Sequence, residues 1–137
     1  MDPLSIAASV IAVLQLTTKV VGYLNSVKNA TKDQARCAIE ASNVLSLLTS
    51  LRFRLEEASR NDPWYCAIRA LAVENGPLDQ YKDALERLLD KIAPQDGPGK
   101  VRGVLLWILD KQEVAEILSK VERLKALTQI ALEMDHL

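Results

Sequence analysis

The feature that most constrains this chain is an uncharged stretch close to its start. Residues 4–18 contain no acidic or basic side chain, and the first charge after them is Lys19. A run of this kind is typical of a secretion signal, of a membrane anchor, or of a helix that other parts of a protein cover on most sides. The three alternatives differ in what they require of the flanking residues.

A secretion signal is disfavoured, because it needs positive charge before its apolar stretch and a small-residue cleavage site after it. Here Asp2 precedes the run, and no convincing cleavage site follows. A permanent membrane anchor is not favoured either, because the run is shorter than the roughly 20 residues that span a bilayer. Its extension to Leu24 would reach that length, but it then contains Lys19, Gln15 and four hydroxyl side chains.

Asp2 and Pro3 are typical of a helix start, since aspartate accepts bonds from free N–H groups and proline fits the first helical position. We expect a helix over 3–27 that is apolar almost all round. In the simplest interpretation it lies centrally in a helical bundle, where a seam of small and polar residues lets a neighbour approach closely. In the functional interpretation it is buried at rest and later released into lipid or an oligomer. The seam consists of Ser5, Ala8, Ala12, Gln15 and Lys19.

The remainder of the chain predicts an all-α fold. Apolar residues make up 49% of the sequence and aromatic residues only 4%, and Ala and Leu are abundant, which favours helices over strands. Polar breaks and prolines delimit further helices at 32–59, 63–74, 77–93 and 110–134. The stretch 101–109 fits either a short buried strand or a helical turn, and its helical neighbours favour the turn. We therefore expect one domain, 1–137, folded as a helical bundle of four long helices plus one or two short ones.

Apolar residues that recur at spacings of three and four define the faces expected to point inward. The most regular stripe belongs to the helix at 32–59 and places Cys37 inside, and Cys66 is likewise expected to be a small core residue. The other residues of these inward faces are Ala41, Val44, Leu48, Leu51, Leu55 and Ala58; Trp64, Ile68 and Leu71; Leu78, Tyr81, Leu85, Leu88 and Ile92; and Val114, Ile117, Leu118, Val121, Leu124, Thr128 and Ala131, with a second face of Leu127, Ile130 and Met134.

No group of residues suggests catalysis, a cofactor or a metal site. The one histidine, His136, lies near the C-terminus, where chains fray, and it has no metal-ligand spacing with Cys37 and Cys66. The sequence GPGK at 97–100 lacks the first glycine and the final hydroxyl residue of a phosphate-binding loop, so a plain turn is expected. A net charge of −1 makes nucleic acid a poor partner. We therefore expect no enzyme activity, no cofactor and no metal.

Four stretches, which together cover nearly the whole chain, resemble one protein family. The opening MDPLSIAASVIAVLQLTTKVVGYL resembles that of the fungal HeLo-like domains, which stand at the N-terminus of NLR-like proteins of the STAND type. The resemblance continues through LLTSLRFRLEEA, PWYCAIRALAVENGPLDQYKDALERL and LLWILDKQEVAEILSKVERLKALTQIALEMD. The junction 107–110 followed by EVAEILSKVERLK is especially characteristic.

The resemblance implies a helical effector domain that acts in programmed cell death and heterokaryon incompatibility. It implies fusion to a nucleotide-binding oligomerisation module, so the chain is expected to be an excised part of a longer protein. Related bundles, in the necroptosis pseudokinase and in plant immune receptors, become membrane-active when they oligomerise. If this behaviour is transferred to the present chain, the domain is cytoplasmic, self-associates and binds membrane lipids after activation. It then relocates to the plasma membrane. The alternative is a protein–protein interaction or oligomerisation module without membrane activity. The residues implicated by position are Leu4, Ile6, Val10, Ile11, Val13, Leu14 and Leu16.

Overall fold

A computed structural model describes residues 3–26, 31–57, 62–92 and 109–134, and the fold of this part is all-α, with 90% helix and no strand. Its five helices begin and end close to the expected positions. They are α1 (Pro3–Asn25), α2 (Lys32–Glu56), α3 (Pro63–Leu71), α4 (Pro77–Ile92) and α5 (Lys111–Met134).

Two helices end three residues before their expected positions: α2 was expected to reach residue 59 and ends at Glu56, and α3 was expected to reach residue 74 and ends at Leu71. Ala72 forms the C-cap, and a turn follows in which Gly76 N–H bonds to the Val73 carbonyl at 2.9 Å. Asn75 adopts a left-handed φ of 59°, as the Asn-Gly pair predicts. The turn lets Pro77 open α4 immediately afterwards.

Local signals in the sequence explain the starts of the long helices. At α2, the Thr31 hydroxyl accepts a bond from the Gln34 backbone N–H, and the Gln34 side-chain oxygen accepts one from the Thr31 backbone N–H. At α5, the Glu113 amide donates to the Asp110 carboxylate at 2.8 Å. Both are capping boxes, which satisfy first-turn N–H groups that have no partner inside a helix.

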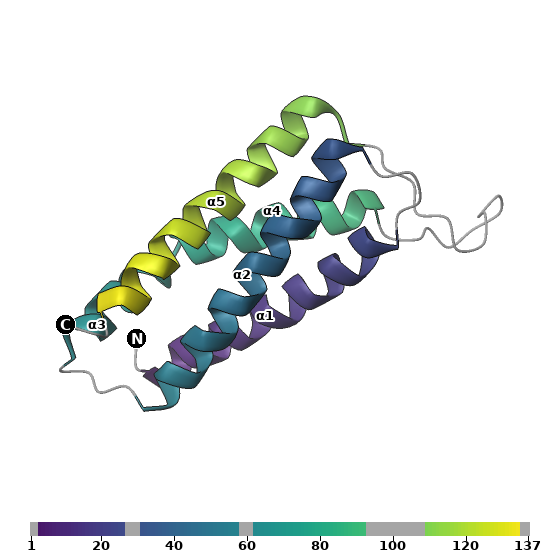
Figure 1. The fold of residues 1–137 in the computed structure, drawn as a ribbon. Helices are drawn as coiled ribbons and strands as arrows, with labels where there is room; N and C mark the ends of the chain where they lie inside the picture. Colours follow the sequence, from purple (N-terminus) through teal and green to yellow (C-terminus); the bar gives the residue numbers. More distant parts are fainter. Residues whose placement is uncertain (1–2, 27–30, 58–61, 93–108, 135–137) are drawn as a thin grey trace.

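The helices lie side by side in two antiparallel pairs (Figure 1). α1 runs antiparallel to α2, and α4 runs antiparallel to α5. α1 also contacts α4, and α2 also contacts α5, so each of these helices has two neighbours among the four. The short α3 lies at the end where α1 begins and contacts α5.

The core forms between these helices, and the predicted inward stripes are confirmed for α2, α3, α4 and α5 wherever they are described. The expectation for Cys66 was wrong: this thiol is exposed, because α3 turns Trp64, Tyr65 and Ile68 inward and Cys66 lies on the other side of the helix. Of the second face proposed for α5, Leu127 is half-buried and Ile130 is exposed.

Some expectations lie outside the described residues. These are the cap at Asp2, the inward position of Ala58, the turn at 97–100, the stretch 101–108 and His136.

Candidate functional site

The candidate site is helix α1, whose two faces have opposite environments. One face carries Ile6, Val10, Val13, Thr17, Val20 and Leu24, all at most 5% exposed. Their spacing alternates between four and three residues, so they form one stripe along the helix. This stripe packs into the core against α2 and α4.

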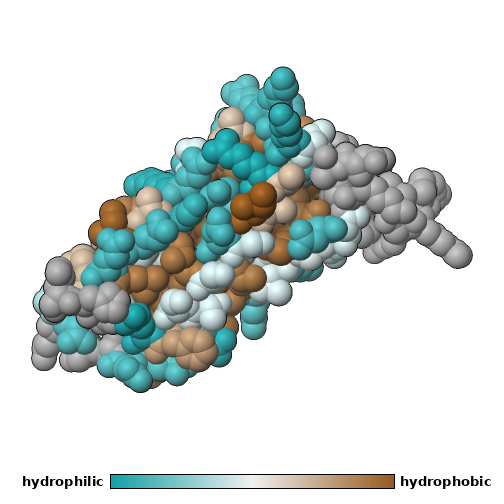
Figure 2. Space-filling view, in the orientation of Figure 1, coloured by the Kyte–Doolittle hydropathy of each residue, from teal (hydrophilic) through white to brown (hydrophobic). Residues whose placement is uncertain are grey.

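The opposite face of α1 is open to solvent, which corrects an expectation from the sequence. All five residues of the small-residue seam, Ser5, Ala8, Ala12, Gln15 and Lys19, are exposed. Among the described helices none packs on this seam, so α1 is not a central helix covered on all sides by them. Apolar and weakly polar surface accordingly reaches the outside along α1 and α2, whereas hydrophilic side chains predominate along α5 (Figure 2).

Of the seven residues implicated in membrane activity, some lie on the buried face of α1 and others are partly or largely exposed. Ile6, Val10 and Val13 are buried, while Leu4 is 82% exposed. The other three, Ile11, Leu14 and Leu16, are half-buried along the edges of the stripe. The segment Leu4–Asn25 is long and apolar enough to cross a membrane by length and composition, a test that core helices and signal sequences also pass. Only 28% of its most apolar window is buried here.

α1 differs from its neighbours in how it is attached. Lys19 is its only charged side chain and makes no ion pair within the described part of the chain. The hydroxyls of Ser9, Thr18 and Ser26 bond to carbonyls of their own helix. In contrast, ion pairs join α2 to α5 and α4 to α5. These pairs are Arg36–Glu122, Glu40–Lys125, Arg87–Glu116 and Lys91–Glu113.

One buried polar contact does connect α1 to α4. The Thr17 hydroxyl donates to the Val13 carbonyl at 2.8 Å and lies 2.7 Å from the Tyr81 hydroxyl, with both side chains 0% exposed. Burial raises the pKa of the Tyr81 phenol well above its usual range. The inward position of Tyr81 was predicted, but its partner was not. The signal was available, because Thr17 continues the stripe at four residues from Val13.

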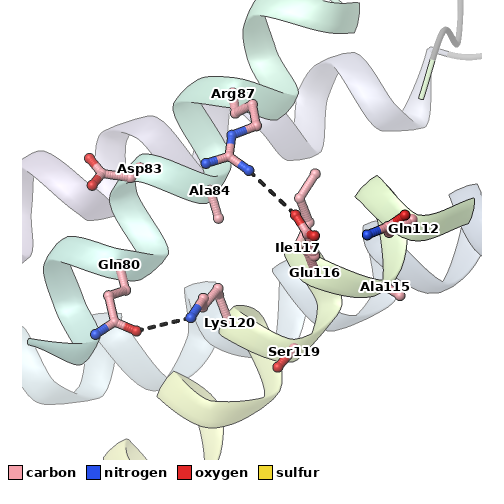
Figure 3. A pocket seen from close by; sticks show the side chains of 10 residues that line it. All are labelled: Gln80, Asp83, Ala84, Arg87, Gln112, Ala115, Glu116, Ile117, Ser119 and Lys120. Atoms are coloured by element: carbon pink, nitrogen blue, oxygen red, sulfur yellow. Dashed lines mark hydrogen bonds and ion pairs between the residues drawn. The ribbon is translucent and has the colours of Figure 1, made fainter. Parts of the chain in front are cut away.

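A groove between α4 and α5 has a volume of about 660 Å³ (Figure 3). Its wall carries both signs of charge, including the Arg87–Glu116 pair at 3.6 Å. The Gln80 side-chain oxygen accepts bonds from Lys120 and from Arg123, each at 3.1 Å. The described residues contain no group of histidine, cysteine or carboxylate side chains that could hold a metal ion.

No protein family, no curated protein and no solved structure matches this chain.

Proposed function

We propose that this chain is the N-terminal effector domain of a fungal NLR-like protein of the STAND type. In this proposal α1, α2, α4 and α5 form a bundle of four long helices, and the domain induces programmed cell death by targeting membranes after oligomerisation. It is not an enzyme, and it works without a cofactor. A nucleotide-binding module in the same protein supplies the clustering, and the domain moves from the cytoplasm to the plasma membrane.

The observation that carries the proposal is the one-sided packing of α1. A helix with the length and composition of a membrane span has its outer face exposed, and that face carries one charge, Lys19. A soluble protein gains no stability from a nearly uncharged outer face of this length. The same face is suited to contact with lipid, where each charged residue near the middle of a span is costly.

The attachment of α1 supports the same proposal. Its buried stripe consists of aliphatic side chains and Thr17, and it makes no described ion pair with another helix. Aliphatic contacts in a core can be replaced by contacts with acyl chains, because both environments exclude water. Ion pairs have no such substitute in lipid. Among the four long helices, α1 is therefore the one that can leave the others at the smallest cost in polar contacts.

The test is dye leakage from vesicles of phosphatidylcholine and phosphatidylserine, with the domain fused to an inducible oligomeriser. We expect leakage on clustering, and its loss in Ala12→Asp. Ala12 is exposed, so the substitution leaves the folded domain intact, whereas a charge near the middle of a span costs about 2.5–3.5 kcal/mol, roughly a hundredfold in partitioning. Ala126→Asp is the matched control, because it places the same charge on an exposed alanine of α5 and leaves leakage unchanged.

The proposal fails if the clustered wild-type domain neither binds nor permeabilises these vesicles. The alternative function is an interaction or oligomerisation module without membrane activity. It is favoured by two large apolar side chains on the outer side of α2, Ile39 at 60% and Phe53 at 64% exposed. That function predicts a stoichiometric complex by light scattering, loss of the complex in Phe53→Asp, and no vesicle flotation.

A further inference from the structure

The hydroxyl pair between α1 and α4 has a defined direction. A threonine hydroxyl has a single hydrogen, and in Thr17 it is donated to the Val13 carbonyl at 2.8 Å. The hydrogen between Thr17 and Tyr81 must therefore come from Tyr81. The result is a chain of two bonds, Tyr81 O–H to Thr17 O–H to Val13 C=O, that ends on the backbone of α1.

This chain of two hydrogen bonds is also protected from water. Thr17 and Tyr81 are both 0% exposed, so the bond has no competing water partner in the docked position. When α1 leaves α4, the Tyr81 hydroxyl loses its acceptor on α1 and meets water instead. The bond then favours the docked position by the net contribution of one hydrogen bond, roughly two- to tenfold in the docking equilibrium.

The geometry points to a latch: the Tyr81–Thr17–Val13 hydrogen-bond chain favours the docked position of α1 on α4, and its loss raises the population in which α1 has separated while α2, α4 and α5 stay together. The ion pairs of Arg36, Glu40, Arg87 and Lys91 tie α2 and α4 to α5, and none of them involves α1. The latch therefore lies at the boundary between the helix that is proposed to enter lipid and the helices that remain. Its consequence for membranes rests on the proposed function, but the opening of α1 does not.

Hydrogen exchange of backbone amides tests the latch in the soluble domain without lipid. We expect α1 amides to exchange through an opening of lower free energy and weaker urea dependence than the slowest amides of α2 and α5. A separated α1 is an isolated helix that frays, so its amides exchange. In Tyr81→Phe the α1 amides exchange roughly two- to tenfold faster, and in Thr17→Val, which leaves the docked Tyr81 hydroxyl without an acceptor, roughly five- to 150-fold faster.

Two variants serve as controls. Thr17→Ser keeps the hydroxyl and restores α1 exchange to near the wild-type rate. Thr128→Val makes the same chemical change in α5. It removes a buried hydroxyl that has no hydrogen-bond partner among the described residues, and it leaves the latch intact.

The latch is overturned if α1 amides exchange with the same free energy and urea dependence as the slowest amides of α5, or if Tyr81→Phe leaves α1 exchange unchanged. Leakage by the clustered Tyr81→Phe domain separates this inference from the proposed function. Faster α1 exchange together with faster leakage supports both. Faster α1 exchange without any leakage supports the latch and counts against the membrane function.

Discussion

At the scale of single residues, Thr17 and Tyr81 make unequal contributions to the same bond. Loss of the Tyr81 hydroxyl leaves Thr17 still bonded to the Val13 carbonyl, whereas loss of the Thr17 hydroxyl leaves the Tyr81 O–H buried without an acceptor. We predict that Tyr81→Phe lowers the free energy of unfolding by about 0.5–1.5 kcal/mol and Thr17→Val by about 1–3 kcal/mol. Adding Tyr81→Phe to Thr17→Val then restores part of the loss. Urea unfolding of the three variants measures this, and equal, additive losses would contradict the direction of the bond.

A second prediction concerns Cys37. Burial, assisted by nearby Asp33, raises the pKa of its thiol from 9.0 to about 11. Between these values the unfolded chain has lost a proton that the folded protein keeps, so the stabilisation is fully present below about pH 9 and is lost as the pH rises through 11. In a Cys66→Ser background, we predict that the free energy of unfolding falls more steeply between pH 8.5 and 10 than in Cys66→Ser/Cys37→Ala. Parallel slopes would show that Cys37 is not shielded from water.

At the scale of the helices, the buried face could be predicted from the sequence only where apolar and charged residues alternate along the helix. α2 and α4 alternate apolar and charged residues, so a spacing of three and four residues identified their buried faces. α1 has almost no charge to mark its outer side, and the small seam was assigned to an interface although it is exposed. The bond between Thr17 and Tyr81 joins residues 64 apart, and no local pattern encodes such a pair. The separation of α1 from the ion-pair network likewise depends on tertiary arrangement.

Because α1 has one exposed and one buried face, the same substitution at adjacent positions should change the free energy of unfolding by very different amounts. Ala12 is exposed and Val13 is 3% exposed. Ala12→Asp should lower the free energy of unfolding by at most about 0.7 kcal/mol, the difference in helix propensity. Val13→Asp should lower it by several kcal/mol, because it places a charge in the core. Circular dichroism during urea unfolding measures both changes. If the two substitutions destabilise the domain equally, the outer face of α1 is covered in solution.

At the scale of the whole molecule, separation of α1 exposes two surfaces at once. The stripe on α1 contains five aliphatic side chains, each of which stabilises the packed state by about 1.5–3 kcal/mol, and acyl chains can cover it after separation. The matching core surface of α2 and α4 has no such cover in a single domain. Under the proposed function, neighbouring copies in a cluster pack these surfaces together, so we expect clustering to lower the cost of releasing α1.

This argument predicts how leakage depends on the number of linked domains. At a fixed total concentration of domain, we predict that leakage rises more steeply than in proportion to the number of copies per oligomeriser, from one to two to four or more. Two effects act together: linked copies bind one vesicle with higher avidity, and their uncovered core surfaces lie at high local concentration. Ala12→Asp in the largest assembly should abolish leakage while the assembly stays intact by light scattering, which separates lipid entry from clustering. Leakage that is equal per domain at every valency would mean that α1 leaves a single domain without help from its neighbours, and the exposed core of α2 and α4 would then have no role in assembly.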